Sequence, residues 1–579
     1  MAGGGRGTTE EWRLGIELSG TEDVEAAEAE LEPARDHSAE RLERPLWIIT
    51  AEGLAWIAVV CGAVAGRFIA LGARPLDSVE AGHALGELEM LRTGALSGPQ
   101  LGWPHLLEAA VFAAFGASDS AARVVFALSG LLLVAMGLAM RRHIGRAGGV
   151  TFAALLALSP SIAYFSRTGY GVVPALALAM LALAVFLRLV DKPGRAGAIG
   201  MGVAAGLGLA TDGAAIMTAL FLLVALVAAG VGRRRGGRLR QRLWAWFARR
   251  KALLFISVAI TALVWLACES VFPLRSPLEA IAASFGSNFA ATGRRGVAAG
   301  LDFYLPMLSL YEFLIVLLAV LGAIGILTMR IRSRLALAAL IWSVVAASFY
   351  LWTPARSPDA VLQMIVPMAL LGAFVIEYFH HTEAWSLIRF PIAALALLTL
   401  YVQVTNNFAW SAPDPSQPAD DRSALLFWTE PTTTLQTPIE CARVAGALPQ
   451  SGARAFFASE SPALRWYLRG LSSATTADSA AAIVGGVELA GLSATDTLDT
   501  YDFELSDVWH PEWRTLSAES ALDYLLFRRA WRPILRRRVS IVVRRAVPVA
   551  PTIIYVPSPQ PAPPSDSDGH SAGTLNKPP

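Results

Sequence analysis

Residues 72–100 read GARPLDSVEAGHALGELEMLRTGALSGPQ and directly follow a long apolar run at residues 46–71. Four titratable side chains in this stretch are spaced three, three and four residues apart: Asp77, Glu80, His83 and Glu87. On a helix, side chains at this spacing share one face. The sequence therefore predicts a helix that presents acids and a histidine immediately outside a membrane anchor. This face could be a reactive site or only a solvated helix start.

The composition indicates a membrane protein. The chain has 579 residues, of which 54% are hydrophobic and 16% charged, and its mean hydropathy is +0.49. Soluble domains carry about 25% charged residues. Long apolar runs separated by arginine clusters are typical of a polytopic α-helical membrane protein. The basic clusters adjoin the apolar runs, so we expect no nucleic-acid partner.

Charge distribution predicts the topology. A run at 101–116 contains Pro104, His105 and Glu108 and is shorter than the roughly 20 residues that a span needs. If this run lies along the membrane surface, all the basic loops fall on the cytoplasmic side, as the positive-inside rule requires. We therefore predict a long first outer loop at 72–120, a cytoplasmic N-terminus and an extracytoplasmic C-terminal region. Eleven other apolar runs are predicted to span: 46–71, 121–140, 149–166, 172–190, 196–211, 213–231, 251–272, 303–329, 335–352, 361–380 and 389–410.

Composition also predicts the domain organisation. Within 430–550, short strand-like runs alternate with helical ones, which indicates a small α/β domain. This domain has no Gly-rich phosphate loop and no catalytic motif, so we expect it to cap or bind. The predicted regions are a disordered acidic cytoplasmic tail at 1–44, a membrane domain at 45–410, a linker at 411–429, the extracytoplasmic domain at 430–550 and a disordered Pro/Ser-rich tail at 551–579.

Several local patterns occur in a fixed order along the chain. VEAGHALGELEMLRTG is followed by GPQLGWPHLLEAAVFAAFGASDSAARV, then by ALLALSPSIAYFSR, SPALRWYLRG and AWRPILRRRVSIVVR. This order resembles the type C glycosyltransferase superfamily, which includes the protein mannosyltransferases and the aminoarabinose transferases. Within it, the chain looks most like the flippase-activity-associated membrane proteins. The resemblance covers roughly residues 46–550.

The resemblance implies a multi-pass protein of the cell membrane that takes a sugar from a polyprenyl-phosphate donor. The acceptor is a glycan or a protein on the outer side. In such enzymes an Asp of the first outer loop acts as general base or as ligand to a divalent cation, Mg²⁺ or Mn²⁺. The attacking hydroxyl has to lose a proton, and the departing lipid phosphate carries negative charge that a cation can stabilise.

The chain departs from the family pattern at three polar positions. Two positions that usually carry Asp are occupied by Val79 and Val172, and one that often carries Lys holds Asp212. Two functions therefore stay open: sugar transfer, or a non-catalytic relative that binds lipid-linked sugar and assists its export or assembly. A substrate-coupled transporter is a third alternative, although no inverted repeat is evident.

The acids of the outer loop are the catalytic candidates. Asp77 could replace the missing base, yet Asp77-Ser-Val-Glu80 is also typical of a helix capping box. Glu80 matches the second acid of the family. His83 could ligate a metal together with Glu80 or Glu87, three and four residues away, or it could lie on an exposed helix face.

The candidates for substrate binding are basic residues predicted on the outer side. Arg167 could hold a phosphate or simply extend from the end of a span toward water. Arg356 is a similar phosphate candidate, and the pair Arg294 and Arg295 could contact a lipid headgroup. Glu108 lies in an apolar run, so we expect it to face the protein or water and to line the cavity.

Overall fold

The computed structural model describes most of the chain, and its residues from Ala55 onward belong to one compact unit, 55–579. The predicted tail at 1–44 and the predicted linker at 411–429 lie outside the described residues. The described ranges are 50–94, 103–211, 213–231, 238–271, 298–352, 358–408, 432–448, 454–457, 461–473, 482–484, 498–508, 515–527, 531–532, 534–544 and 552–557.

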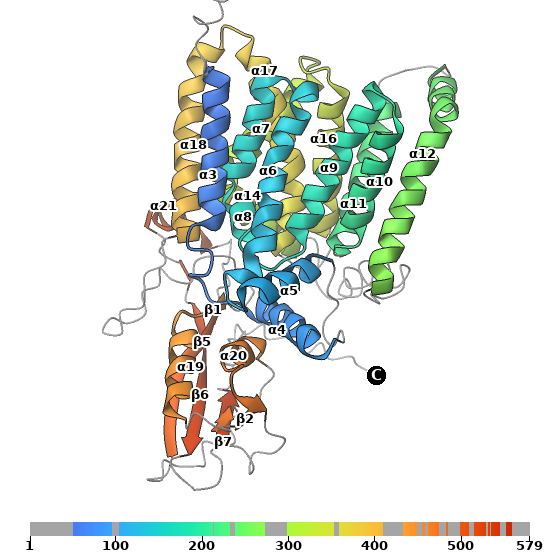
Figure 1. Ribbon diagram of the computed structural model, residues 1–579. Helices are drawn as coiled ribbons and strands as arrows, with labels where there is room; N and C mark the ends of the chain where they lie inside the picture. The colour runs from blue at the N-terminus through green and yellow to red at the C-terminus, as the bar shows by residue number, and fades with distance from the viewer. Residues whose placement is uncertain are drawn as a thin grey trace, which may run out of the picture. The chain divides into compact units, whose positions relative to one another are not determined.

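Helices dominate the described part of the chain up to residue 408 (Figure 1). Each of the eleven apolar runs predicted to span holds one helix or a pair of helices. The helices are α3 (Ala51–Phe68), α4 (Ser78–Thr93), α5 (Trp103–Phe115), η1 (Ala121–Arg123), α6 (Val124–Ile144), α7 (Arg146–Leu158), α8 (Pro160–Phe165), α9 (Val172–Asp191), α10 (Arg195–Leu209), α11 (Gly213–Val231), α12 (Arg238–Val271), α14 (Ala298–Tyr311), α15 (Phe313–Leu327), α16 (Arg334–Trp352), η3 (Pro358–Ala360), α17 (Val361–His380) and α18 (Trp385–Phe408).

The protein is a multi-pass helical membrane protein. Seven of the described helices are long and apolar enough to cross a membrane, and an eighth span results if α14 and α15, bent by 98°, are one span. Three shorter apolar helices fill the remaining predicted runs, at 146–158, 195–209 and 215–230. The predicted class, a multi-pass helical membrane protein, is confirmed. The number of helices or helix pairs of full span length is seven or eight among the described residues, compared with about eleven predicted spans.

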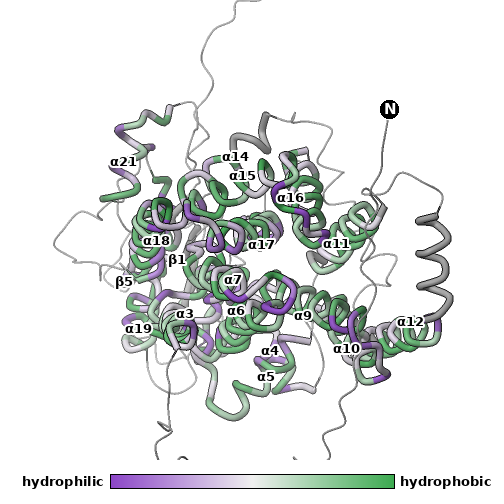
Figure 2. The backbone as a smooth tube through the Cα atoms, turned by 90° about the horizontal axis from the view of Figure 1, so that it is seen from above, coloured by the Kyte–Doolittle hydropathy of each residue, from purple (hydrophilic) through white to green (hydrophobic). Residues whose placement is uncertain are grey.

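The membrane helices stand side by side, and α17 lies at the centre. In the 18-residue apolar stretch of η3 and α17, 89% of the residues are buried. The corresponding share is 6% for α12 and 17% for α18. Figure 2 shows mainly hydrophobic residues along the helices when the bundle is viewed from above. Exposed apolar side chains on α12 and α18 are what a lipid-facing surface requires, because lipid cannot hydrogen-bond to polar groups.

Two helix breaks face each other inside the bundle. Ser159 caps α8 after α7 ends, and Glu312 separates α14 from α15. The Glu312 carboxylate accepts hydrogen bonds from Ser159 Oγ at 2.7 Å and from the backbone N–H of Ser161 at 3.0 Å. A carboxylate at a helix N-terminus satisfies amides that have no partner within the helix. This contact explains why two apolar runs predicted as single spans are each divided.

The C-terminal region forms a mixed sheet. The described strands pair in the order β1-β5-β6-β4-β2-β3, and β7 pairs with β2 and β6. The α/β class is as predicted, but β5 was not predicted, and β7 occupies the start of the region predicted as a disordered tail. The elements are β1 (Thr432–Thr433), α19 (Gln436–Ala447), β2 (Arg454–Phe457), α20 (Pro462–Tyr467), β3 (Ser472–Ser473), β4 (Ala482–Val484), β5 (Leu498–Val508), α21 (Ala518–Phe527), β6 (Leu535–Arg544) and β7 (Thr552–Pro557).

Helix α20 joins this domain to the segment predicted as the first outer loop, 72–120. Trp466 is fully buried in an apolar cluster with Leu76 and Phe112. Its indole Nε1 donates to Asp119 Oδ1 at 2.8 Å, and the Tyr467 hydroxyl donates to Asp119 Oδ2 at 2.6 Å. Helices α4 and α5 therefore lie between the membrane bundle and the sheet domain, as Figure 1 shows.

We predict that Gly137→Ala destabilises the bundle where α6 meets α7. A Cβ atom at Gly137 would lie 2.6 Å from Ala153 Cβ and 2.6 Å from the carbonyl oxygen of Gly149. We expect a loss of about 1–3 kcal/mol, typical of overpacking, measured as a lower melting temperature in detergent. Gly62→Ala is the matched control, because a Cβ there meets nothing within 4 Å. Equal melting temperatures for the two variants would contradict this packing.

Candidate functional site

Asp77 begins helix α4 by capping it. Its Oδ1 accepts the backbone N–H groups of Val79 and Glu80, both at 2.9 Å. In return, Glu80 Oε2 accepts the backbone N–H of Asp77 at 3.0 Å, which completes a capping box. The capping interpretation of this motif is confirmed. The second oxygen, Asp77 Oδ2, lies 3.4 Å from the Tyr170 hydroxyl and 4.0 Å from Arg74 Nη2.

Glu80 is the centre of a buried ion-pair network. Arg123 donates through Nε to Oε1 at 2.8 Å and through Nη2 to Oε2 at 2.6 Å, a bidentate pair. Arg74 Nη2 donates to Oε2 at 3.1 Å, and the Gly169 backbone N–H donates to Oε1 at 3.0 Å. Burial by itself raises the pKa of Glu80, but Arg123 and Arg74 outweigh it and hold this pKa at about 2. Such a carboxylate is a weak base.

Arg123 also fixes the backbone that leaves α3. Its Nη1 donates to the carbonyl oxygens of Leu71 at 3.2 Å and Arg74 at 2.6 Å, and its Nη2 donates to that of Pro75 at 3.0 Å. The side chain is only 1% exposed. Every nitrogen of this guanidinium has an acceptor, so its role is to hold the loop and Glu80 in place.

A small pocket opens beside this network. Arg167, predicted to hold a phosphate, is part of its lining. Its guanidinium donates to the carbonyl oxygens of Ile69 at 2.8 Å and Ala70 at 2.9 Å, at the end of α3. Burial, together with Arg123 and Arg74, lowers the pKa of Arg167 to about 10, so it stays charged at neutral pH. The residues that line the pocket are Leu71, Arg74, Arg123, Tyr164, Arg167 and Asn407.

Positive charge exceeds negative charge around the pocket. Among the described residues, the carboxylates that contact these arginines are Glu80 and Asp77. Four buried guanidinium groups gather here, so two positive charges have no carboxylate counter-ion among the described residues. Concentrated charge in a setting of low dielectric attracts an anion strongly. The four groups are Arg67, Arg74, Arg123 and Arg167.

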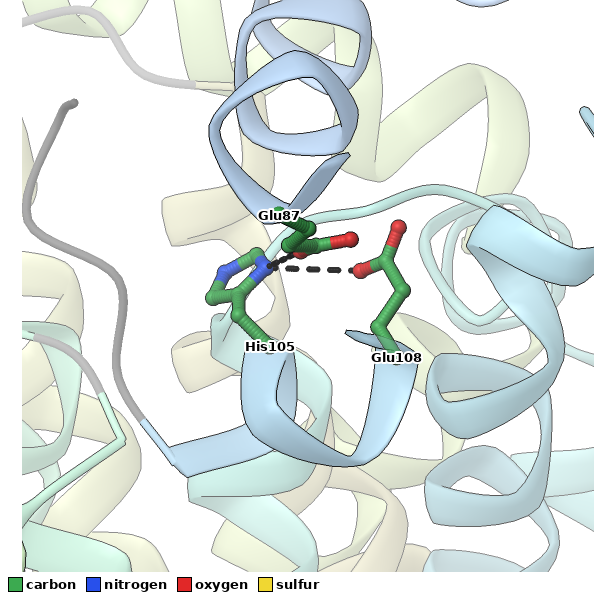
Figure 3. Close-up of side chains that lie close together, drawn as sticks. All are labelled: Glu87, His105 and Glu108. Atoms are coloured by element: carbon green, nitrogen blue, oxygen red, sulfur yellow. Dashed lines mark hydrogen bonds and ion pairs between the residues drawn. The ribbon is translucent and has the colours of Figure 1, made fainter. Parts of the chain in front are cut away.

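A second polar cluster connects α4 to α5 (Figure 3). His105 Nδ1 lies 2.7 Å from Glu87 Oε1 and 3.3 Å from Glu108 Oε2. All three side chains are buried, and their ligand atoms lie within 4.8 Å of one another, an arrangement that could hold a metal ion. Burial, and then the neighbouring carboxyl group, raises the pKa of Glu87, and burial raises that of Glu108.

The predicted residues thus fall into separate places. Glu87 joins the cluster with Glu108, whereas His83 lies beside it, with its ring 4.6 Å from that of His105. Neither Glu108 nor Asp77 is part of the pocket lining. Val79 is exposed on α4, and Val172 is fully buried. The remaining predicted residues lie outside the described part of the chain: Arg294, Arg295 and Arg356.

Sequence reasoning did not select Arg74, Arg123 or His105. Arg74 and Arg123 are the isolated charges next to the apolar runs at 46–71 and 121–140, and a charge in that position is a recognised signal of a buried polar site. His105 lies in the run at 101–116, where the sequence uses it only as evidence against a membrane span. Its partner Glu87 is distant in the sequence and lies on another helix, so no local pattern connects them.

Comparisons with known proteins show the fold. No protein-family model matches the chain, and no curated protein matches it. The crystal structure of ArnT from Cupriavidus metallidurans in the apo state matches with a TM-score of 0.51 and 16% identity, over 73% of this chain and 86% of that one. The same protein bound to undecaprenyl phosphate matches with a TM-score of 0.52 and 14% identity, over 86% and 99%.

These similarities confirm the predicted type C glycosyltransferase-like membrane fold. The similarity to ArnT extends over nearly the whole of that protein, so it includes both the membrane bundle and the C-terminal region. The closer likeness to flippase-activity-associated proteins stays a prediction.

We predict that Glu80→Gln destabilises the protein by about 3–5 kcal/mol, because it leaves buried arginines without their counter-ion. The pH dependence should change too. The pKa of Glu80 falls from 4.5 to about 2 on folding, so its contribution is complete above pH 4.5 and is lost as the pH falls toward 2. Glu89→Gln, on the exposed part of α4, is the control. Thermal unfolding across this pH range measures both the loss of stability and its pH dependence. If the melting temperatures of the wild type and Glu80→Gln fall in the same way at low pH, Glu80 is not the buried counter-ion of these arginines.

Proposed function

We propose that this protein binds a polyprenyl-phosphate-linked sugar at the outer face of the cell membrane, with the phosphate in the arginine pocket, and acts in the assembly of surface glycans or glycoproteins. The observation that carries the proposal is the excess of buried positive charge around the pocket. A lipid phosphate would supply the missing negative charge. ArnT, which has the same fold, has been crystallised with undecaprenyl phosphate.

The pocket arginines keep hydrogen-bond donors for such a ligand. A guanidinium has five N–H groups. Among the described residues, Arg74 donates two hydrogen bonds, to Tyr164 and Glu80, and Arg167 donates three. Both side chains line the pocket, and arginine binds phosphate through paired N–H groups. Arg123, in contrast, is fully engaged and contributes its charge.

The position of the pocket in the bundle supports an outward orientation. Arg123 lies at the beginning of α6, whereas the basic residues Arg141 and Arg142 lie in its last turn. A cytoplasmic location for the basic end places the pocket and the sheet domain outside. The N-terminus would then be cytoplasmic. An acceptor glycan or protein would reach the pocket from the side on which the sheet domain lies.

We expect Arg74→Gln and Arg167→Gln to weaken binding of undecaprenyl phosphate about 10- to 100-fold, because each removes charge-assisted hydrogen bonds worth about 1.5–3 kcal/mol. Affinity can be measured by titration in detergent micelles. Arg92→Gln, an exposed arginine on α4, is the control variant. Undecaprenol is the control ligand for the wild type, since it has the lipid tail without the phosphate. Equal affinity of the wild type for the two lipids would overturn the proposal, whatever the variants do.

Glycosyl transfer is the second candidate function, and one contact favours it. Asp77 Oδ2 is directed toward Arg74, a pocket-lining residue, at 4.0 Å. The cap uses Oδ1, so Oδ2 is the oxygen that could accept the proton of an attacking hydroxyl. Glu80 is a poorer base, because its two arginines hold its pKa at about 2. Asp77 is therefore the catalytic candidate, and Glu80 the residue that positions the arginines.

Asp77→Asn separates the two roles of Asp77. Asparagine caps helices about as well as aspartate does, but it cannot act as a base. If transfer occurs, we expect Asp77→Asn to keep the helix cap and to lose about 100-fold or more in rate. Asp77→Ala should lose stability as well, by about 1 kcal/mol. Transfer from a labelled polyprenyl-phosphate sugar gives the rate, and an unchanged rate in Asp77→Asn would exclude Asp77 as the base.

A divalent cofactor, Mg²⁺ or Mn²⁺, stays a prediction for the transfer reaction. Such cations neutralise phosphate charge and prefer oxygen ligands. At the pocket described above, the lining supplies positive charge through arginines instead. The residues that could hold a metal are the Glu87–His105–Glu108 cluster, which is not part of that lining.

A further inference from the structure

Three buried ligands from two helices converge at one point, and the pocket chemistry does not use them. Glu87 comes from α4, and His105 and Glu108 come from the first two turns of α5. Their side chains are 0%, 5% and 2% exposed. Figure 3 shows all three pointing toward one another. Helices α4 and α5 are both part of the predicted outer loop. A group bound between these three side chains would therefore hold the two helices, and with them the loop, in place.

Two carboxyl groups cannot both be charged here without a cation. Moving an ion out of water costs several kcal/mol unless a partner compensates. Arg123 is the nearby cation, but Glu80 and backbone carbonyls occupy its guanidinium. Among the described residues, Glu87 Oε2 is fully buried and has no hydrogen-bond partner. The cluster therefore requires either protons on its carboxyl groups or a bound cation.

The ligand set and its spacing point to a particular class of cation. One imidazole nitrogen and two carboxylate oxygens suit a borderline transition-metal ion such as Zn²⁺, whereas Mg²⁺ and Ca²⁺ prefer oxygen ligands alone. Zinc lies about 2.0–2.2 Å from such ligands, so the ligand atoms of a tetrahedron are about 3.4 Å apart. The separation of 3.3 Å from His105 Nδ1 to Glu108 Oε2 is close to that value, whereas the 2.7 Å to Glu87 Oε1 is a hydrogen-bond distance that would lengthen when a metal binds.

A second histidine adds an independent observation. The ring of His83 lies 4.6 Å from that of His105, edge to face. Its Nδ1 is buried and has no hydrogen-bond partner among the described residues. His83 comes from α4, one turn before Glu87, so it lies on the same side of that helix. A buried imidazole nitrogen without a partner calls for an explanation, such as a bound ion close to it.

We propose that Glu87, His105 and Glu108 bind one Zn²⁺-class transition-metal ion that joins α4 to α5. The role of this metal ion is to hold the loop in place. It does not take part in binding the phosphate. None of the three ligands lines the arginine pocket, so this inference is independent of the proposed lipid binding. His83 completes the polar surroundings of the ion from the α4 side.

The test uses the full-length protein purified in detergent from zinc-supplemented cells. We expect about one zinc per chain in the wild type, bound at a single site. Glu87→Gln and His105→Gln should lose this metal, while Glu89→Gln and His143→Gln, altered outside the cluster, should keep it. After chelation the wild-type melting temperature should fall, and added Zn²⁺ should restore it. Undecaprenyl phosphate affinity reports separately on the pocket.

A metal-exchange measurement needs no variant, so it remains decisive if the variants do not fold. Co²⁺ added to the chelated wild type should give the visible absorption of a low-symmetry Co²⁺ site with nitrogen and oxygen ligands, and Zn²⁺ should abolish it. Wild-type protein that contains no zinc, gives no Co²⁺ spectrum and shows no change in melting temperature with either metal would overturn the proposal. The two carboxyl groups would then share protons instead.

Discussion

The salt bridge from Glu80 to Arg123 and Arg74 connects four segments that are far apart in the sequence. Glu80 lies in the first turn of α4, Arg74 in the segment before it, Arg123 at the start of α6 and Gly169 between α8 and α9. All of these groups meet on one buried carboxylate. Removing that carboxylate would leave two guanidinium groups unpaired in a low dielectric, which is among the most costly single changes a fold can undergo.

This arrangement explains how the outer loop combines acidic residues with an anion-binding pocket. The acids of the loop have different tasks: Asp77 caps α4, Glu80 pairs with arginines and Glu87 belongs to the cluster with His105. Once these acids are engaged, the arginines that remain near α3 and α8 carry uncompensated charge. The surplus supports the proposed phosphate ligand, because charge in a buried pocket is weakly screened.

The loop that contains α4 and α5 also contacts the C-terminal domain. Asp119 accepts hydrogen bonds from Trp466 and Tyr467, and the Tyr467 hydroxyl in turn accepts the backbone N–H of Leu76. Leu76 immediately precedes the residue that caps α4. The sheet domain therefore contacts the loop one residue from Asp77, the residue proposed as the base. The capping or binding role expected from its sequence stays a prediction.

Local patterns determined much of this protein. Hydrophobic runs predicted the membrane class, and Asp77 and Glu80 predicted the start of α4, because capping depends on neighbours within one turn. The tertiary structure decided the rest. Glu312 divides two apolar runs through a contact with Ser159, and Arg74 and Arg123 form the pocket only because Glu80 draws them together. Periodicity in the sequence records which face of a helix is buried, whereas the partner of a buried charge depends on which helices pack together.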